Sequence, residues 1–264
     1  KVLKYLGTDP LLAGFAGGDR GVKFIKDVNK LKIESIYIQT ESMTRSCTTL
    51  ISENPHNVTE IIDPSPQITS GEAKSLLEKI KEVSDDYGAI IISGTHPNGM
   101  PQSIYKEILD CFKDKLSVID AYLDIKTILE SGPKMMKVNK KELFAITGKT
   151  EIDKAAAHCF NHYKLGYLGV TDGPEVAYLF MNRAKYLYQI PSVNVLNSTG
   201  ARDAVGAATV YKHFIEQGDM DVAYHFGLAC GLASCETNMP SEFSLTRAME
   251  LLDKIEWKML GWKK

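Results

Sequence analysis

The chain has 264 residues, of which 44% are hydrophobic and 24% charged, so it can bury a large core as one α/β domain or as one domain with a small appendage. A net charge of -2 without a basic, aromatic-interleaved stripe argues against nucleic acid as the main partner and predicts a small ligand. No apolar run reaches membrane-spanning length, and the five cysteines show no metal-ligand spacing, so we expect a cytoplasmic protein with reduced thiols and no membrane partner.

The first segments predict a βα unit. Residues 1–7 have the pattern of a helix end stopped by Gly7, and because the sequence starts without Met, we expect the true N-terminus to lie upstream. Leu11–Phe15 then predicts a short strand, and a glycine-rich stretch leads into a helix. These glycines form neither a Rossmann fingerprint nor a P-loop, so a bound nucleotide must be held in another way.

Residues 35–63 show a hydrophobic period near two and no helical pattern, which predicts an antiparallel patch that acts as a lid. We therefore expect an α/β domain made of residues 1–34 and 64–264, with residues 35–63 inserted as lid strands. Arg45 starts a strand among hydroxyl residues, where it either binds a phosphate with two hydrogen bonds or is simply solvated. Exposed lid strands also favour pairing between subunits, so we expect a homodimer through them.

The segments that follow predict a parallel sheet. After a helix from about Ser70 to Val83, capped by Ser70, the β-branched run 89–94 is typical of a central parallel strand. It ends in a polar loop rich in Gly and Pro at 93–101, and residues 116–119 repeat the unit with a helix near 125–130. Ligands of open parallel sheets gather where such strands end.

Two further segments have both a structural and a functional interpretation. Asn139 followed by Glu142 has the spacing of a capping box, and it would also place Glu142 near a magnesium ion, directly or through water. Residues 167–174 predict a strand that ends in a turn before a hairpin. Thr171 and Gly173 in that turn either lie under a nucleotide or simply make the turn.

Residues 193–208 change from strand to helix at Gly200. Unpaired N–H groups and the positive end of the helix dipole make such a start an anion site, and Gly200 and Ala201 keep side chains out of a phosphate's way. The carboxylate of Asp203 would repel a phosphate unless a metal offsets its charge or it takes a proton, as a general base does in phosphoryl transfer. Asp in the first helical turn is also an ordinary start signal.

Four segments in this order resemble the signatures of the ribokinase-like (PfkB) carbohydrate kinases. They are Ser93–Pro101, Asn139–Glu142, Val170–Gly173 and Gly200–Asp203, which are similar to SGSLPxG, NxxE, SLG and GAGD. The match runs over nearly the whole chain and is most similar to the tagatose-6-phosphate kinase and 1-phosphofructokinase branch, whose segments resemble Gly14–Gly18, Thr44–Cys47 and Gly231–Ser234.

The resemblance implies a three-layer α/β/α sandwich with a mostly parallel central sheet and a small antiparallel β lid. It implies ATP and Mg²⁺ as cofactors, and a kinase that converts a sugar phosphate, tagatose 6-phosphate, to tagatose 1,6-bisphosphate. The residues that it implies are Thr171, Gly173 and Ser234 at the adenine, Gly200, Ala201 and Arg202 as the anion hole, Glu142 and Asn139 near Mg²⁺, Arg45 at the sugar phosphate and Asp203 as the general base.

Departures from the family pattern keep alternatives open. The family's first strand, with a sugar-binding Asp, and its GGKGxN segment should precede Lys1, so the N-terminal part of the domain is expected to be missing. Arg202 replaces a small residue of the anion hole, where its bulk could block the γ-phosphate or its charge could grip it. The alternatives are a catalytically impaired binding or regulatory module, a 1-phosphofructokinase, or a nucleoside or vitamin kinase, against which Arg45 argues.

Overall fold

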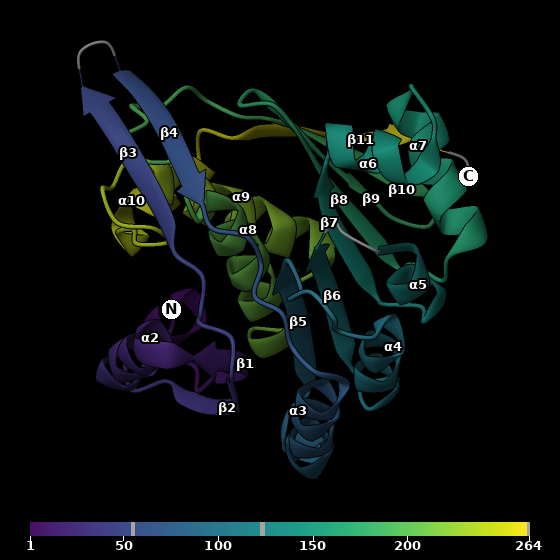
Figure 1. Ribbon diagram of the computed structural model, residues 1–264. Coiled ribbons are helices and arrows are strands. Elements are labelled where there is room, and N and C mark those ends of the chain that lie inside the picture. The colour runs from purple at the N-terminus through teal and green to yellow at the C-terminus, as the bar shows by residue number, and fades with distance from the viewer. Residues whose placement is uncertain (54–55, 122–124, 263–264) are drawn as a thin grey trace. The chain divides into compact units, whose positions relative to one another are not determined.

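The computed structural model describes residues 1–53, 56–121 and 125–262, which form two compact units (Figure 1). The first unit consists mainly of Leu3–Asp86 and Thr95–Cys111, and the second of Tyr87–Gly94 and the chain from Phe112 onward. Residues 54 and 55 of the predicted lid lie outside the described residues. None of the described helices has the length and apolar character needed to span a bilayer.

The first unit holds two small sheets. Strand β1 (Leu11–Gly17) pairs in parallel with β2 (Glu34–Thr40), and β3 (Cys47–Glu53) pairs antiparallel with β4 (His56–Ile62). The expected antiparallel patch is therefore wrong for its first strand, because helix α2 returns the chain to run beside β1 in the same direction. The helices of this unit are α1 (Val2–Tyr5), α2 (Gly18–Lys30), α3 (Ser70–Val83), η1 (Ser84–Asp86) and α4 (Gln102–Asp110).

The second unit is built on a seven-stranded sheet with the order β11-β10-β9-β8-β7-β6-β5. Strands β5 to β8 run parallel to one another, and the β8–β9, β9–β10 and β10–β11 pairs are antiparallel. The strands are β5 (Ala89–Gly94), β6 (Leu116–Ala121), β7 (Met135–Asn139), β8 (Tyr167–Asp172), β9 (Val176–Phe180), β10 (Ala184–Gln189) and β11 (Glu256–Gly261).

Helices cover both faces of this sheet, which confirms the expected α/β/α layers (Figure 1). On one face, Phe160 of α7 and Phe180 of β9 both contact Trp262 edge-on. On the other, Tyr188 of β10 contacts Tyr224 of α9 at 5.7 Å between ring centroids. The helices are α5 (Ile125–Glu130), α6 (Lys140–Thr147), α7 (Ile152–His162), α8 (Ala201–Val210), the π-helix η2 (Tyr211–Ile215), α9 (Met220–Cys235) and α10 (Leu245–Leu252).

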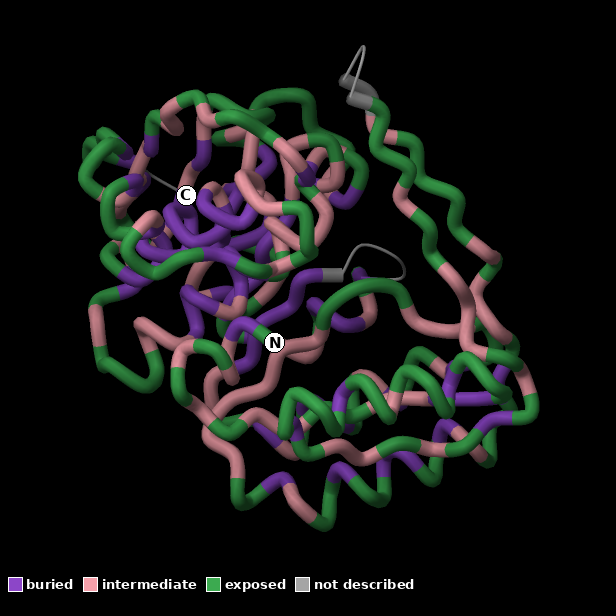
Figure 2. Tube along the Cα trace, turned by 90° about the vertical axis from the view of Figure 1, so that its left-hand side faces the viewer, coloured by how far each residue is buried: buried purple, intermediate pink, exposed green. Residues whose placement is uncertain are grey.

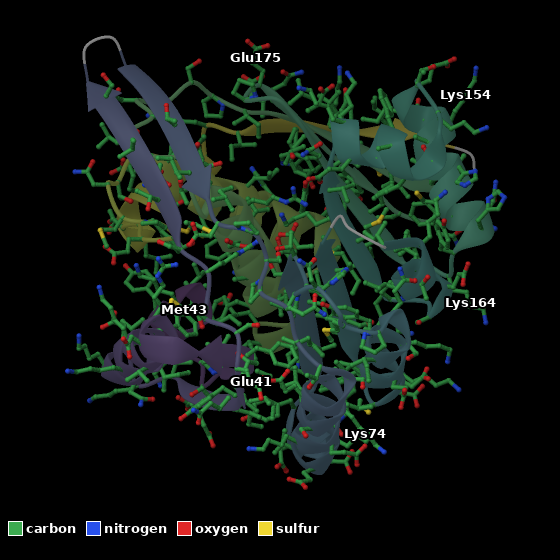
Figure 3. The ribbon with its side chains drawn as sticks, in the orientation of Figure 1. Glu41, Met43, Lys74, Lys154, Lys164 and Glu175 are labelled. Atoms are coloured by element: carbon green, nitrogen blue, oxygen red, sulfur yellow. The ribbon has the colours of Figure 1, made fainter. Side chains whose placement is uncertain are left out.

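The core of the second unit lies between this sheet and its helices. Figure 2 shows buried positions gathered along the inner helices and strands, whereas the β3–β4 hairpin of the first unit is mostly exposed or half-buried. Charged side chains such as those of Lys154, Lys164 and Glu175 point outward from the second unit (Figure 3).

Helices α8 and α9 pack unusually closely, because α9 presents glycine to α8. A Cβ atom added at Gly227 would lie 2.6 Å from the carbonyl oxygen of Val205, and one added at Gly231 would lie 2.9 Å from that of Ala201. Both distances are below van der Waals contact with backbone, which moves less easily than a side chain. The glycines of α9 therefore set the position of the start of α8.

We expect Gly231→Ala to lower the free energy of unfolding by about 1–3 kcal/mol, because an extra methyl group overpacks this contact and outweighs the better helix propensity of Ala. Urea unfolding followed by circular dichroism measures it. The control is Gly261→Ala in β11, where an added Cβ meets no atom within 4 Å. Equal stability of the two variants would show that the α8–α9 contact adapts freely.

Candidate active site

The strand register brings several polar residues to one edge of the sheet. Ser93 of β5 is paired with Asp120 of β6, and Asn139 of β7 is paired with Thr171 of β8. These residues are at or next to the carboxyl ends of their parallel strands, where open α/β sheets bind ligands. Helix α8 begins at the same edge, because Ser93 Oγ donates a hydrogen bond of 3.0 Å to Asp203 Oδ1.

The turn into α8 requires glycine at position 200. Gly200 has a φ of +79°, and a Cβ atom there would lie 2.4 Å from Ser241 Oγ and 2.9 Å from Ser241 N. Ser241 Oγ donates to the Gly200 carbonyl at 2.9 Å. Nearby, buried Asn197 donates from Nδ2 to the Asn238 carbonyl at 3.0 Å. Both the backbone conformation and the close approach of residues 238–241 therefore exclude a side chain here.

Two N–H groups at the start of α8 remain open. Ala201 N donates to the Ser198 carbonyl and Ala204 N to that of Gly200. Among the described residues, no hydrogen bond outside the helix uses the N–H groups of Arg202 or Asp203, which precede the first intrahelical bonds. With the positive end of the helix dipole, these donors have the arrangement that the predicted anion site needs, and the site itself stays a prediction.

Asp203 presents a carboxylate beside these amides. The residue is exposed, and the hydrogen bond from Ser93 fixes its Oδ1 atom. An accessible carboxylate of fixed orientation next to an anion site can accept a proton from a hydroxyl group that approaches the anion.

Arg202 turns its guanidinium to two carboxylates. Its Nε lies 2.6 Å from Asp120 Oδ1, and its Nη1 lies 2.6 Å from Glu142 Oε1. Lys137 Nζ lies 2.7 Å from the other oxygen of Asp120, and the side chain of Lys137 is only 1% exposed. We call these four residues, Lys137, Asp120, Arg202 and Glu142, the ion-pair chain.

Burial acts on the groups in and beside the ion-pair chain. It lowers the pKa of Lys137, and Asp120 partly offsets that effect. Burial also acts to lower the pKa of Arg202, but the hydrogen bonds and charges of Glu142 and Asp120 outweigh it and raise this pKa. Tyr224 is fully buried beside the ion-pair chain, and its hydroxyl has no hydrogen-bond partner among the described residues.

The capping box predicted at Asn139 and Glu142 is confirmed at the start of α6. Its hydrogen bonds limit how Glu142 can bind a metal ion. Glu142 N donates to Asn139 Oδ1 and Asn139 N donates to Glu142 Oε2, each at 2.9 Å. Since Arg202 occupies Oε1, direct ligation of Mg²⁺ by Glu142 and Asn139 does not fit this arrangement. Among the described residues, no group of three or more His, Cys, Asp or Glu side chains could hold a metal ion. Contact through water stays a prediction.

The predicted adenine residues separate into two classes. Thr171 is half-buried at the end of β8, and Gly173 is exposed in the following turn with a φ of +70°. Asp172 between them pairs with Lys140 at 2.8 Å. Ser234 is 1% exposed and its hydroxyl donates to the Gly231 carbonyl, so its side chain packs inside the unit and is not open to a ligand.

In the first unit, Arg45 lies among hydroxyl groups, as its sequence context suggested. Its Nη1 donates to Ser65 Oγ at 3.1 Å and its Nη2 to Thr95 Oγ1 at 2.8 Å. The loops that carry these hydroxyls are joined by a β-bridge between Gln67 and Asn98. Among the described residues, no carboxylate forms an ion pair with Arg45, so its charge remains available for an anion.

Sequence reasoning did not assign a role to Lys137, Ser93 or Asn197. Lys137 gave a signal, because a charged residue within the apolar run 135–138 of a buried strand needs a partner. The partner, Asp120, lies near the end of the neighbouring apolar strand β6. Ser93 begins a segment that resembles a family signature, but nothing in the sequence indicated its hydrogen bond to Asp203. Asn197 gave no signal that distinguishes it from an ordinary loop residue.

Known proteins share sequence features and the fold of this chain. Residues 1–246 match the pfkB family of carbohydrate kinases. The structure is similar to phosphofructokinase-2 from Escherichia coli in complex with fructose-6-phosphate, with a TM-score of 0.84 and 20% identity over 96% of this chain and 84% of that chain. It is also similar to a possible 1-phosphofructokinase from Thermotoga maritima, with a TM-score of 0.87 and 19% identity over 98% and 85% of the two chains. A match over this much of the sequence, on this fold, shows that the chain belongs to the pfkB family of carbohydrate kinases.

Proposed function

We propose that this carbohydrate kinase transfers a phosphoryl group from ATP to a hydroxyl group of a ketose phosphate. The substrate that we place first is tagatose 6-phosphate, with tagatose 1,6-bisphosphate as the product. The observation that carries the proposal is the exposed carboxylate of Asp203 beside the open amides of α8, at the carboxyl edge of the sheet.

Each group at the start of α8 has a task in this reaction. Asp203 takes the proton of the acceptor hydroxyl as the hydroxyl oxygen bonds to the γ-phosphorus of ATP, and the bond between that phosphorus and the bridging oxygen breaks, so that ADP leaves. The N–H groups of Arg202 and Asp203 donate to the transferred group while charge spreads over its oxygens. Mg²⁺, when it accompanies ATP, supplies further positive charge to the phosphates. Thr171 and Gly173 lie under the nucleotide.

Arg45 binds the phosphate that the sugar already carries. Its present partners, Ser65 and Thr95, are neutral, so a phosphate that replaces them gains a charge-assisted interaction at little cost. Hydroxyl groups also remain useful beside the phosphate, since they can donate to its oxygens. This arrangement favours a phosphorylated sugar over an unphosphorylated one.

For Arg45→Ala we expect the KM for the ketose phosphate to rise about 10- to 100-fold, because hydrogen bonds to a charged group contribute about 1.5–3 kcal/mol. The change in kcat should be smaller, and the KM for ATP should stay unchanged. Steady-state kinetics with each substrate varied in turn measure it. Arg183→Ala, which removes an exposed arginine from the turn between β9 and β10, is the control. An unchanged KM in Arg45→Ala would assign the phosphate to another residue.

A coupled ADP-release assay with tagatose 6-phosphate, fructose 6-phosphate and fructose 1-phosphate tests the proposed function. We expect the highest kcat/KM with tagatose 6-phosphate. The second candidate is a fructose phosphate kinase, which the descriptions of the two similar structures favour. ADP release with none of the three sugars would remove the assignment to these ketose phosphates and leave a kinase of another substrate or a module that binds without catalysis.

The β3–β4 hairpin supports a homodimer. Its side chains include exposed apolar residues, which are Leu50, Ile51, Ile61 and Ile62 at 52%, 37%, 55% and 55% exposure. A two-stranded hairpin of this kind gains stability when a second apolar surface covers it. Sedimentation velocity should give a dimer that Ile61→Lys converts to a monomer. A dimer that persists in this variant would place the interface elsewhere.

A further inference from the structure

The guanidinium of Arg202 is held on one side and open on the other. Two of its nitrogens, Nε and Nη1, bind carboxylates, and no hydrogen bond among the described residues uses Nη2. The side chain of Arg202 is 36% exposed, whereas those of Asp120 and Glu142 are 3% and 16% exposed. An arginine has five N–H donors in a planar fork, so this fixed guanidinium keeps donors for a further anion.

The ion-pair chain is neutral as a whole. Lys137 and Arg202 carry two positive charges, and Asp120 and Glu142 carry two negative charges. Without Lys137 the ion-pair chain would be net negative and would repel a phosphate at close range. The buried lysine therefore balances the charge of Asp120, and the free donors of Arg202 can bind an anion without an excess of negative charge in the ion-pair chain.

Arg202 also has the right place on the helix. It lies directly before Asp203, and its own N–H is one of the two open donors at the start of α8. Its side chain shares Glu142 with the cap of α6, so α6, β6 and β7 all hold it in one orientation. Such a preorganised donor costs little reorganisation when an anion arrives.

We propose that Arg202 is a built-in cation for the terminal phosphates of the nucleotide, positioned by Asp120 and Lys137, so that the chain binds ATP even when no divalent metal accompanies it. This inference rests on the proposed function for its nucleotide. It also gives Glu142 a defined task, which is to hold the guanidinium.

The test compares the affinity of the whole chain for ATP in EDTA and in excess Mg²⁺, measured by isothermal titration calorimetry. For the unaltered protein we expect the dissociation constant in EDTA to be within about tenfold of that in Mg²⁺. For Arg202→Gly we expect the ratio of the dissociation constant in EDTA to that in Mg²⁺ to rise at least tenfold. A tenfold rise corresponds to about 1.4 kcal/mol of binding free energy. Arg183→Ala should leave the ratio unchanged.

Two further variants separate charge from position. Arg202→Gly leaves the carboxylate of Glu142 without its partner, and the double variant with Glu142→Gln removes that negative charge. If the donors of Arg202 matter, the double variant should still bind metal-free ATP weakly. Asp120→Asn with Lys137→Met weakens the hold on Arg202 and keeps the summed charge of the ion-pair chain at zero, so the ratio should rise here as well, which a purely structural role would not cause. Circular dichroism checks that each variant is folded.

An unchanged ratio in Arg202→Gly, or recovery of metal-free binding in the double variant with Glu142→Gln, would overturn the inference. Tighter ATP binding by Arg202→Gly in both buffers would also overturn it and show that the side chain obstructs the site. An unaltered protein that binds ATP only with Mg²⁺ would overturn the inference and leave the proposed function intact. Failure to bind ATP in either buffer would overturn both.

Discussion

Asp203→Asn should lower kcat by about 10³-fold or more and leave the dissociation constant of ATP nearly unchanged. The amide is the same size as the carboxylate and can still accept the hydrogen bond from Ser93, but it cannot take a proton from the acceptor hydroxyl. The backbone N–H groups that hold the phosphates are untouched by the change. Steady-state ADP release gives kcat, and calorimetry gives the affinity for ATP.

The matched control is Asp172→Asn, which removes a carboxylate at the end of β8. Asp172 pairs with Lys140 and has no place in the proton transfer, so its kcat should stay within about threefold of the original. If Asp203→Asn retained a near-normal kcat, Asp203 would not be the general base. If it lost ATP binding as well, the carboxylate would have a structural task at the helix start.

Lys137→Met should lower the free energy of unfolding by about 3 kcal/mol or more, the largest stability change that we expect in the chain. Removing one partner of a buried ion pair leaves the other charge without compensation, which typically costs about 3–5 kcal/mol. Arg202 remains beside Asp120 and places the expected cost at the low end of this range. Urea unfolding followed by circular dichroism measures the loss.

Lys185→Met is the control, because Lys185 is also a buried lysine in a strand of the same sheet. Its partner Asp153 is 57% exposed, so water can solvate the carboxylate once the lysine is gone. The loss should be about 1 kcal/mol, mostly from the contacts of Lys185 with the rings of Tyr178 and Phe180. Equal losses of unfolding free energy in the two variants would contradict the claim that the buried carboxylate of Asp120 needs the positive charge of Lys137.

Local patterns were sufficient to predict most elements of the second unit. Residues 89–94 form β5 as their β-branched composition indicates, and the capping box at Asn139 and Glu142 forms as its spacing indicates. Short-range signals of this kind depend on backbone conformations that a few neighbouring residues determine. The cap of α3 is Thr69 and not Ser70, and α8 begins at Ala201, one residue after the change predicted at Gly200. Such shifts are usual for helix ends.

Pairing between distant segments could not be predicted in the same way. The sequence around β2 alternates as an antiparallel strand would, but its partner is β1, since a helix joins the two. Strand β11 was not expected, because its pairing with β10 depends on residues about 70 positions earlier in the chain. Contacts across such separations are set by tertiary structure and not by local propensity.

The candidate site shows the same division. Gly200 and Asp203 could be found from the predicted start of a helix after Gly200, although the strand expected before it is wrong, because residues 190–200 form no strand. The contact of Arg202 with Asp120, in contrast, spans 82 residues. The choice that the sequence left open, whether Arg202 blocks the anion site or grips an anion, depends on these partners. They turn the guanidinium towards Asp120 and Glu142, and the adjacent amides remain open.

The most direct test of the central claim, that the first amides of α8 hold the phosphates of ATP, is nuclear magnetic resonance of the ¹⁵N-labelled protein titrated with a non-hydrolysable ATP analogue. We expect the amide signals of Arg202 and Asp203 to shift together as the analogue is added and to reach a plateau. The dissociation constant fitted to these shifts should equal the one that calorimetry gives, and the amide signal of Arg183 should not shift. Binding of the analogue without movement of the Arg202 and Asp203 signals would contradict the claim.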